Sequence, residues 1–443
     1  MQNEIIELIE AHKYAKVREL FLEMNVVDIA GEIEGMDEPV AITLFRMLPK
    51  DTAAEVFAYL TSDMQQSIIE AITDREIGDI LNDLFLDDAV DFIEEMPASV
   101  VKRVLANVSK KNRELINQFL KYPEDSVGSI MTIEYVYLRD HNTVAEAFER
   151  VRRTGPDKET IYMLYVTDRE AHLMGALSAK SLMLASPGDT IGSLMETNII
   201  SAHTHDDRES LSNEFTKYGL LTMPVVDNEN RLVGIVTVDD VLEVQQEETT
   251  EDFERMAAML PSEDPYLKSS VVTLSKNRIF WLLLLMLSAT INGAIIGDFE
   301  EALAVLPALV AYIPMLMGTG GNAGAQSSTL VIRGLALEEI SIGDTGRIFV
   351  KEVLVAALCG IVLFTVNFLR IIILGGDILI SLSVSLSLFA TILLANVVGG
   401  LLPLFAKRFK MDPAVMAAPV ITTIIDAASL LVFFAISNAI LQI

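Results

Sequence analysis

A single aspartate, Asp426, lies inside the apolar stretch that ends the chain, and Asp412 stands 14 residues earlier, at the start of that stretch. If the stretch is a helix that rises about 1.5 Å per residue, about 21 Å separate the two residues along its axis. An ionised side chain at such a depth in a bilayer is costly, so Asp426 must face another helix or an aqueous route. Thr422 lies one turn earlier on the same helical face and adds a hydroxyl oxygen. We expect Asp426 to border a cation pathway, with Asp426, Thr422 and Asp412 as candidate metal ligands; a neutral, hydrogen-bonded aspartic acid between helices is the alternative.

A glycine-rich stretch, PMLMGTGGNAGAQSSTLVIRG, offers neutral oxygen atoms to the same pathway. Pro314 predicts a kink, and Gly318, Gly321 and Gly324 predict irregular backbone with exposed carbonyl groups. Asn322 adds an amide oxygen. These residues are predicted to line the pore, since irregular backbone at membrane depth is tolerated beside protein or a water-filled cavity. For a second small-residue stretch, ANVVGGLLP, tight helix packing is an equally good interpretation.

Two acidic stripes with helical spacing occur in the first 275 residues. Like charges at this spacing repel one another, so each stripe is either a solvated face or one side of a site that cations bridge. Carboxylate oxygens are the ligands that a hard cation such as Mg²⁺ prefers. The first stripe consists of Asp88, Asp91 and Glu95, and the second of Glu243, Glu247, Glu251 and Glu254.

Charge and hydropathy divide the chain into two parts. Residues 1–275 hold 52 acidic and 24 basic side chains, whereas residues 276–443 hold 10 and 9 and are mostly apolar. An acidic surface of this size repels phosphate groups, so we expect no nucleic-acid partner. It suits cations, although solubility alone is the alternative explanation. The single cysteine, Cys359, excludes a disulfide within one chain.

Five apolar stretches of roughly 20 residues or more predict an all-α transmembrane domain over residues 276–443. Basic residues lie before the first stretch and in the loops that follow the second and fourth stretches. Because basic loops stay on the cytoplasmic side, this pattern places the N-terminus in the cytoplasm and the C-terminus outside the cell membrane. The start of the chain is charged and lacks the apolar core of a signal peptide. The expected spans are 279–297, 303–323, 350–374, 378–404 and 413–441.

The preceding residues read as three further parts. Apolar periodicity predicts an acidic helical domain over residues 1–125, stacked as a superhelix of short helices. Residues 126–190 and 191–245 form an internal repeat of mixed strands and helices, and TMPVVDNENRLVGIVTVDDV in the second copy resembles a CBS domain. In CBS domains that bind adenine nucleotides, a Thr and an Asp at T-x-x-D spacing hold the ribose. Thr237 and Asp240 match that spacing, so ATP is a candidate ligand; a purely structural pair is the alternative. A connecting helix is expected over 246–275.

This combination resembles the bacterial MgtE magnesium transporters over essentially the whole chain. The most specific segments are PMLMGTGGNAGAQSSTLVIRGLALEEI and MDPAVMAAPVITTIIDAAS. The resemblance implies a homodimeric magnesium channel with Asp426 as the pore aspartate, facing its counterpart in the second subunit. It also implies regulatory Mg²⁺ between the cytosolic domains and a connecting, or plug, helix. The matching acidic positions are Asp240, Glu243, Glu248, Glu251 and Asp252, with Asp91 and Glu95 facing them.

The predicted mechanism is gating by the transported ion. High cytosolic Mg²⁺ draws the acidic faces together and holds the plug helix over the pore, and low Mg²⁺ lets them repel. Two alternatives remain open: a secondary transporter in which Asp426 carries a proton or binds Na⁺, and a membrane-tethered nucleotide sensor without transport. An enzyme is not expected, because no nucleophile–histidine pair, phosphate-binding loop or histidine-rich metal site occurs in the sequence.

Overall fold

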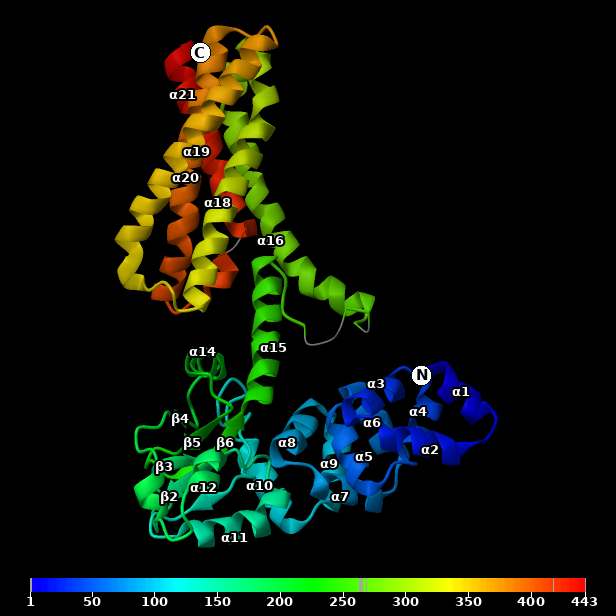
Figure 1. Ribbon diagram of the computed structural model, residues 1–443. Coiled ribbons are helices and arrows are strands. Elements are labelled where there is room, and N and C mark those ends of the chain that lie inside the picture. The colour runs from blue at the N-terminus through cyan, green and yellow to red at the C-terminus, as the bar shows by residue number, and fades with distance from the viewer. Residues whose placement is uncertain (1, 263–265, 268, 417, 443) are drawn as a thin grey trace. The chain divides into compact units, whose positions relative to one another are not determined.

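A computed structural model describes residues 2–262, 266–267, 269–416 and 418–442. These residues form two compact units, Met1–Gln245 and Gln246–Ile443. Figure 1 colours the chain from blue to red along its length. The division falls inside helix α15 (Val238–Met256), well before the predicted start of the membrane domain at residue 276.

Ten short helices open the first unit, as the periodicity of residues 1–125 predicts. Each turns an apolar face to a common core, in which Phe21, Phe57 and Ile69 are almost completely buried. Local sequence defines several of the helix starts. Glu76 Oε2, for example, accepts a hydrogen bond from the Thr73 backbone N–H at 2.7 Å in a capping box. The helices are α1 (Gln2–Glu10), α2 (Tyr14–Glu23), α3 (Val26–Glu34), α4 (Glu38–Phe45), α5 (Lys50–Ala58), α6 (Ser62–Ala71), α7 (Asp74–Asp83), α8 (Leu86–Glu95), α9 (Ala98–Asn107) and α10 (Lys110–Phe119).

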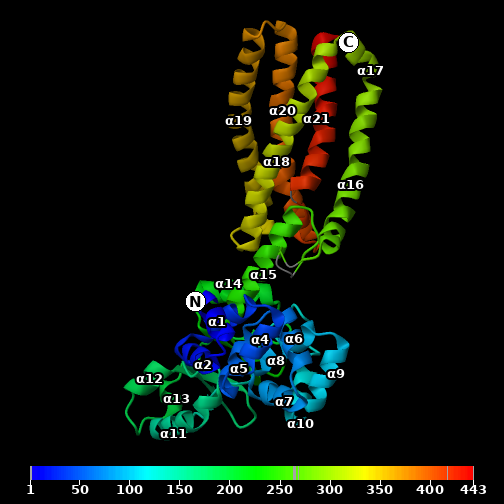
Figure 2. The ribbon, with the colours of Figure 1, turned by 90° about the vertical axis from the view of Figure 1, so that its right-hand side faces the viewer.

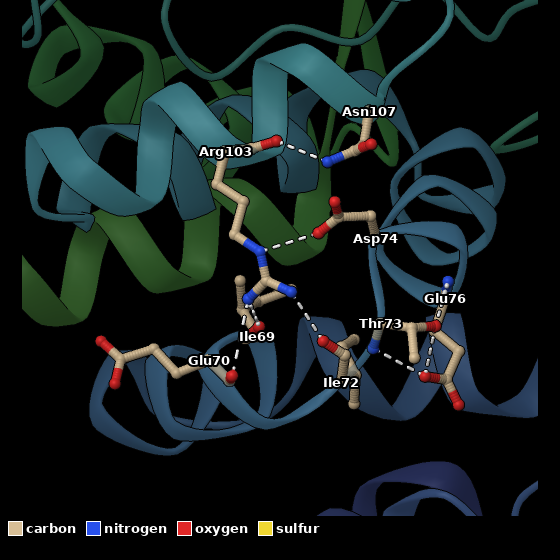
Figure 3. A network of polar contacts seen from close by, with 8 residues as sticks. All are labelled: Ile69, Glu70, Ile72, Thr73, Asp74, Glu76, Arg103 and Asn107. Atoms are coloured by element: carbon tan, nitrogen blue, oxygen red, sulfur yellow. Dashed lines mark hydrogen bonds and ion pairs between the residues drawn. The ribbon is translucent and has the colours of Figure 1, made fainter.

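One arginine joins three of these helices (Figure 3). Arg103 on α9 places Nε 2.9 Å from Asp74 Oδ1, at the start of α7. Its terminal nitrogens donate to the Ile69 carbonyl at 2.6 Å and to the Ile72 carbonyl at 2.8 Å. These carbonyls lie at the end of α6, where helical hydrogen-bond partners run out. Arg103 therefore satisfies the end of α6 and anchors it to its neighbours.

The rest of the first unit is a repeated α+β fold. Each copy has a three-stranded sheet in which the first pair of strands is parallel and the second antiparallel, and equivalent residues pair in both copies. This confirms the predicted repeat. The elements are β1 (Tyr137–Leu138), α11 (Val144–Thr154), β2 (Met163–Thr167), β3 (Leu173–Ser178), α12 (Ala179–Leu184), α13 (Ile191–Leu194), β4 (Ala202–His203), α14 (Arg208–Tyr218), β5 (Thr222–Val226) and β6 (Leu232–Thr237).

The connecting segment is not one helix, so the prediction of a connecting helix over 246–275 is wrong in its second part. Helix α15 ends at Met256, and Ala258 has a positive φ of 53°. The next helix, α16, begins at Val271, where the Ser270 side chain accepts from the Thr273 backbone N–H. Pro261 cannot donate a helical hydrogen bond, and Ser270 provides a new helix start. The acidic helix therefore does not run into the first apolar helix.

Long helices dominate the second unit and run side by side in Figure 2. Among its described residues, four stretches are long and apolar enough to cross a membrane: Val271–Asp298, Ile342–Ile373, Ile378–Arg408 and Pro413–Leu441. They correspond to the first, third, fourth and fifth predicted spans. The helices of this unit are α16 (Val271–Asp298), α17 (Glu300–Val305), α18 (Ile313–Ala336), α19 (Thr345–Ile373), α20 (Ile378–Arg408) and α21 (Ala418–Leu441).

The second predicted span, 303–323, is wrong in its bounds and in its backbone. Residues 300–312 form the short helix α17 and a 3₁₀ segment, and the long helix α18 begins only at Ile313. Pro314 lies in its first turn, where a missing N–H is harmless, so it starts the helix instead of kinking it. The glycine-rich stretch is regular helix. Its small side chains serve close contact with α20 and α21, as described below, and its polar residues keep α18 out of the group of strongly apolar helices.

Candidate ion pathway and cation-sensing cluster

Asp426 lies in the first half of α21, on a face that is neither sealed nor fully open. Its side chain is partly exposed in the single chain. One turn earlier, the hydroxyl groups of Thr422 and Thr423 both donate to the Pro419 carbonyl at 2.9 Å. Each hydroxyl therefore keeps an oxygen lone pair that can accept from a water molecule or contact a cation. The predicted combination of a carboxylate and a hydroxyl oxygen on one helix is present.

Helix α18 supplies the small-residue face against which α21 packs. A Cβ on Gly321 would lie 2.8 Å from the Thr422 methyl carbon, and one on Gly324 would lie 2.8 Å from the Ile421 side chain. These two glycines therefore set the distance between α18 and the helix that carries Asp426. The other two residues predicted to line the pore, Gly318 and Asn322, are exposed on α18 in the single chain.

A very close helix contact joins α18 to α20. A Cβ built on Gly399 would fall 2.2 Å from the Gly324 carbonyl oxygen, which no real side chain tolerates. The ANVVGGLLP stretch thus serves tight packing, one of the two interpretations that its sequence allows.

A second acid inside a candidate span, Glu352 on α19, was not predicted as a site residue. The Ser327 hydroxyl on α18 donates to Glu352 Oε2 at 2.8 Å and lies 3.0 Å from the Asn396 carbonyl oxygen on α20. The Ser327 hydroxyl therefore connects three helices of the unit, with Glu352 as its partner on α19. Its position within the predicted span 350–374 is the signal in the sequence, because an acidic residue inside a span is costly.

In the first unit, carboxylates from α8 gather against those at the start of α15. Asp87 is buried, with 7% of its surface exposed, and burial followed by the charges of Asp88 and Asp240 raises its pKa well above the usual value. Burial, Asp240 and Glu243 raise the pKa of Asp88 to about 7. No basic group is among the leading influences on either acid. We call these residues together with two further acids the acidic cluster, which consists of Asp87, Asp88, Asp91, Glu159, Asp240 and Glu243.

The remaining members of the acidic cluster share the same causes. Burial and then Asp88 raise the pKa of Asp91 to about 8, although much of this residue faces solvent at the edge of the cluster. Burial and then Asp239 raise the pKa of Glu159 to about 7. The pKa of Asp240 rises to about 6 through burial, opposed by a hydrogen bond from Thr237. Crowded carboxylates with pKa values this high repel one another when ionised, which favours a bound proton or cation.

The structure brings together only some of the predicted acids. Asp240 and Glu243 lie near enough to Asp91 for their charges to raise its pKa, whereas Glu95 accepts a hydrogen bond from Ser62 on an exposed surface. Two cluster members, Asp87 and Glu159, were not predicted. Asp87 falls outside the i, i+3, i+7 spacing that singled out the first stripe, and Glu159 lies in a turn where no periodicity marks it. Glu248 lies on α15, partly exposed.

At the end of α15, predicted metal ligands instead contact an arginine. Arg255 forms ion pairs with Glu251, one turn earlier, and with Asp412, just before α21. Asp252 lies close by, since burial and then Asp412 raise its pKa. Among the His, Cys, Asp and Glu of the described residues, no three are arranged as a ready metal-binding group. In this structure, Asp412 and Glu251 are therefore paired with the guanidinium group of Arg255.

The T-x-x-D pair in the second repeat folds back on itself. The Thr237 hydroxyl donates to Asp240 Oδ2 at 2.6 Å. At the equivalent place in the first repeat, the hydroxyl groups of Ser178 and Ser181 lie 2.8 Å apart. The acid that the ribose interaction requires is therefore present in the second copy and replaced by serine in the first.

Comparison with known proteins covers both units. The MgtE family, described as a divalent cation transporter, matches residues 313–436. The MgtE intracellular N domain matches residues 24–125, and the CBS domain matches residues 127–188 and 191–247.

Relatives and solved structures agree with these matches. The chain is 35% identical to the magnesium transporter MgtE of Thermus thermophilus, over 96% of this chain and 95% of that one. It is 31% identical to the magnesium transporter MgtE of Bacillus subtilis, over 98% and 96%. A crystal structure of the cytosolic domain of the Mg²⁺ channel MgtE in complex with ATP is 32% identical with a TM-score of 0.53, covering 55% of this chain and all of that one. From its α-helical N domain, its CBS pair and its bundle of apolar helices, the chain belongs to the MgtE family of magnesium transporters.

Proposed function

We propose that this protein is a Mg²⁺-selective channel that imports magnesium across the cell membrane and closes when cytosolic Mg²⁺ is high. The observation that carries the proposal is the partly exposed Asp426 on α21, packed beside the small-residue face of α18 in a bundle of apolar helices. Its support is membership of a family of magnesium transporters. In this proposal α18 also crosses the membrane, which brings the number of crossing helices to five, and the C-terminus lies outside the cell.

The pore acts on hydrated Mg²⁺. Mg²⁺ gives up its water molecules reluctantly, so a selective pore has to recognise the ion with its water shell. Asp426 supplies the charge, and Thr422 supplies an oxygen that can accept from a coordinated water molecule. Gly321 and Gly324 let α18 pack closely against the turn of α21 that carries Thr422, which fixes the position of this hydroxyl. A second copy of the chain would present an equal set, and a homodimer is therefore part of the proposal.

The acidic cluster is the cytosolic sensor. Asp88 and Asp240 are close enough for each to raise the pKa of a common neighbour, Asp87, and no lysine or arginine is among its leading influences. A divalent cation bound between these carboxylates relieves their mutual repulsion. Asp91, at the exposed edge, is where a hydrated ion reaches the cluster. Binding then favours the conformation in which α8 and α15 lie together.

Adenine nucleotide is a second ligand of the first unit in this proposal. The similar cytosolic domain was crystallised with ATP. Thr237 and Asp240 offer the hydroxyl and carboxylate oxygens that hold a ribose, once their mutual hydrogen bond opens. Because Asp240 belongs to both the T-x-x-D pair and the acidic cluster, nucleotide and Mg²⁺ act on one another.

The test is Mg²⁺ uptake by the purified chain in lipid vesicles. Asp426→Asn keeps the size of the side chain and removes its charge, and we expect uptake to fall at least about tenfold, the effect of about 1.4 kcal/mol. Asp377→Asn is the matched control, because Asp377 caps the start of α20 and asparagine caps equally well. Near-normal uptake in Asp426→Asn would reject the pore assignment.

The same vesicles separate this proposal from a coupled transporter. A channel needs only the Mg²⁺ gradient and the membrane voltage. Uptake that requires a proton or sodium gradient would assign Asp426 to ion coupling, and nucleotide binding without any ion flux would favour the tethered sensor.

A further inference from the structure

Arg255 is a single basic residue within a strongly acidic part of the sequence. Residues 232–267 contain ten acidic side chains and one basic side chain, which is Arg255. In the structure this one cation contacts two acids from different parts of the chain: Glu251, on its own helix, and Asp412, 157 residues later. The three side chains keep between 27% and 35% of their surface exposed, so water does not fully screen the charges.

The same helix end also makes an apolar contact. Met256, the last residue of α15, packs against Ile332 on α18 and Ala414. Ala414 follows Asp412 by two residues, and its backbone N–H donates to Asp412 Oδ1 at 2.7 Å. The two last residues of α15 therefore hold the entry to α21 from two directions, one ionic and one apolar.

We propose that Arg255 is a positioning residue, a built-in counter-cation that anchors the end of α15 to the start of the helix carrying Asp426. This inference rests on the Mg²⁺-gated transport proposed above. Without Arg255, the carboxylates of Glu251 and Asp412, with Asp252 close by, would lose the basic group that forms their ion pairs among the described residues. The end of α15 would then separate from α21 unless Mg²⁺ took the place of the guanidinium. Arg255 therefore sets how much cytosolic Mg²⁺ is needed to hold the channel shut.

The first experiment measures Mg²⁺ uptake by vesicles against a series of internal Mg²⁺ concentrations. In Arg255→Gln we expect the concentration that halves uptake to rise about three- to tenfold, a usual size for coupling between sites. Arg255→Lys keeps the charge and should recover part of the shift. The matched control is Arg347→Gln, which removes an arginine paired with Asp344 at a side chain that is 90% exposed, and should change the value less than about twofold.

A charge exchange tests the pairing itself. Arg255→Asp and Asp412→Arg should each weaken shutoff, and the double variant should restore it toward the parent value, because the ion pair forms again with reversed direction. A fall in the Mg²⁺ concentration needed by Arg255→Gln would show that the arginine competes with the metal, and would overturn the proposal. The proposal would also be overturned if the double variant restored shutoff no better than the single variants.

A cross-linking measurement does not depend on transport. In a Cys359→Ala background, Met256→Cys with Ala414→Cys reports the contact between α15 and the α21 entry through the rate of disulfide formation in a chelator. We expect Arg255→Gln to slow that rate about fivefold, as a usual coupling between sites. If the proposed function fails, no variant moves Mg²⁺ while the cross-linking rate still depends on Arg255. If only this inference fails, Mg²⁺ moves and the rate ignores Arg255.

Discussion

Gly399 has no side chain because the α18 backbone occupies the place where one would stand. The Gly324 carbonyl oxygen lies 2.2 Å from the position that a Cβ would take, and a backbone oxygen inside a packed helix cannot move aside. The contact holds α18 beside α20, and α18 in turn holds α21 through Gly321 and Gly324. The position of Asp426 therefore depends on a glycine in a different helix.

Gly399→Ala tests this chain of contacts. Alanine favours helix by about 1 kcal/mol, but forcing a methyl group into this contact should cost about 1–3 kcal/mol more than that gain. We expect a lower thermal midpoint of the chain in detergent and reduced Mg²⁺ uptake. Gly293→Ala on α16 is the control, because nothing lies within 4 Å of its Cβ position. An unchanged midpoint in Gly399→Ala would mean that the helices separate easily.

At this scale the sequence reveals residues whose chemistry contradicts their surroundings. Asp426 stands out because a carboxylate is out of place in an apolar stretch. Arg255 does not stand out, since an arginine in an acidic helix is ordinary and its partner Asp412 is 157 residues away. The glycines of α18 are ambiguous in the sequence, because the lack of a side chain permits either irregular backbone or close packing. Only the neighbouring helices decide between the two, and here they favour close packing.

Among the elements, α8 and the first turns of α15 matter most, because their faces carry like charges that packing brings together. Helical spacing predicted each stripe separately. It could not predict that Asp87 would be buried while Glu95 turned to Ser62, since both outcomes depend on neighbouring helices. Helical spacing also did not predict that α15 ends at Met256. Spacing shows which residues share a helix face, but it does not show where one helix ends and the next, capped by Ser270, begins.

The acidic cluster predicts a pH-dependent stability. Asp88 and Asp91 have pKa values of about 7 and about 8 in the folded chain, above those of an unfolded aspartate. Between the unfolded and folded values the folded state binds more protons, so the free energy of unfolding falls as pH rises. The contribution is complete below about pH 4 and is lost as pH rises through about 7 to 8.

We therefore expect the thermal midpoint, measured in a chelator, to fall between about pH 6 and about pH 9. Asp88→Asn with Asp91→Asn should flatten this dependence, because two of the titrating groups are gone. Asp63→Asn, on the exposed start of α6, should leave the slope as it was. A midpoint that rises with pH across this range would contradict the assignment.

In the whole molecule, the first 275 residues carry an excess of 28 negative charges, and the residues that follow in sequence are almost neutral and mostly apolar. Monovalent salt screens such a field at long range, whereas a divalent ion also bridges carboxylates directly. The two effects can be separated by comparing MgCl₂ with NaCl at equal ionic strength.

Under that comparison, Mg²⁺ should raise the thermal midpoint of the chain more than Na⁺ does. Mg²⁺ at about 100 times its dissociation constant would add about 2.7 kcal/mol per site. Asp88→Asn with Asp91→Asn should remove most of the difference at neutral pH, and Asp63→Asn should remove none. If the two salts raised the thermal midpoint equally, the acidic cluster would be a solvated surface and not a Mg²⁺ site.

Helix α18 has a consequence for how the protein is made. It carries glycines, serines and an asparagine, and among the described residues it is the long helix of this unit that is not strongly apolar. Its shelter comes from α20 and α21, which a ribosome produces later. During synthesis α18 must therefore wait, partly unprotected from lipid, until the last sixty or so residues arrive. Nascent chains truncated before Ile378 should expose α18 to quality-control proteases that the finished protein resists.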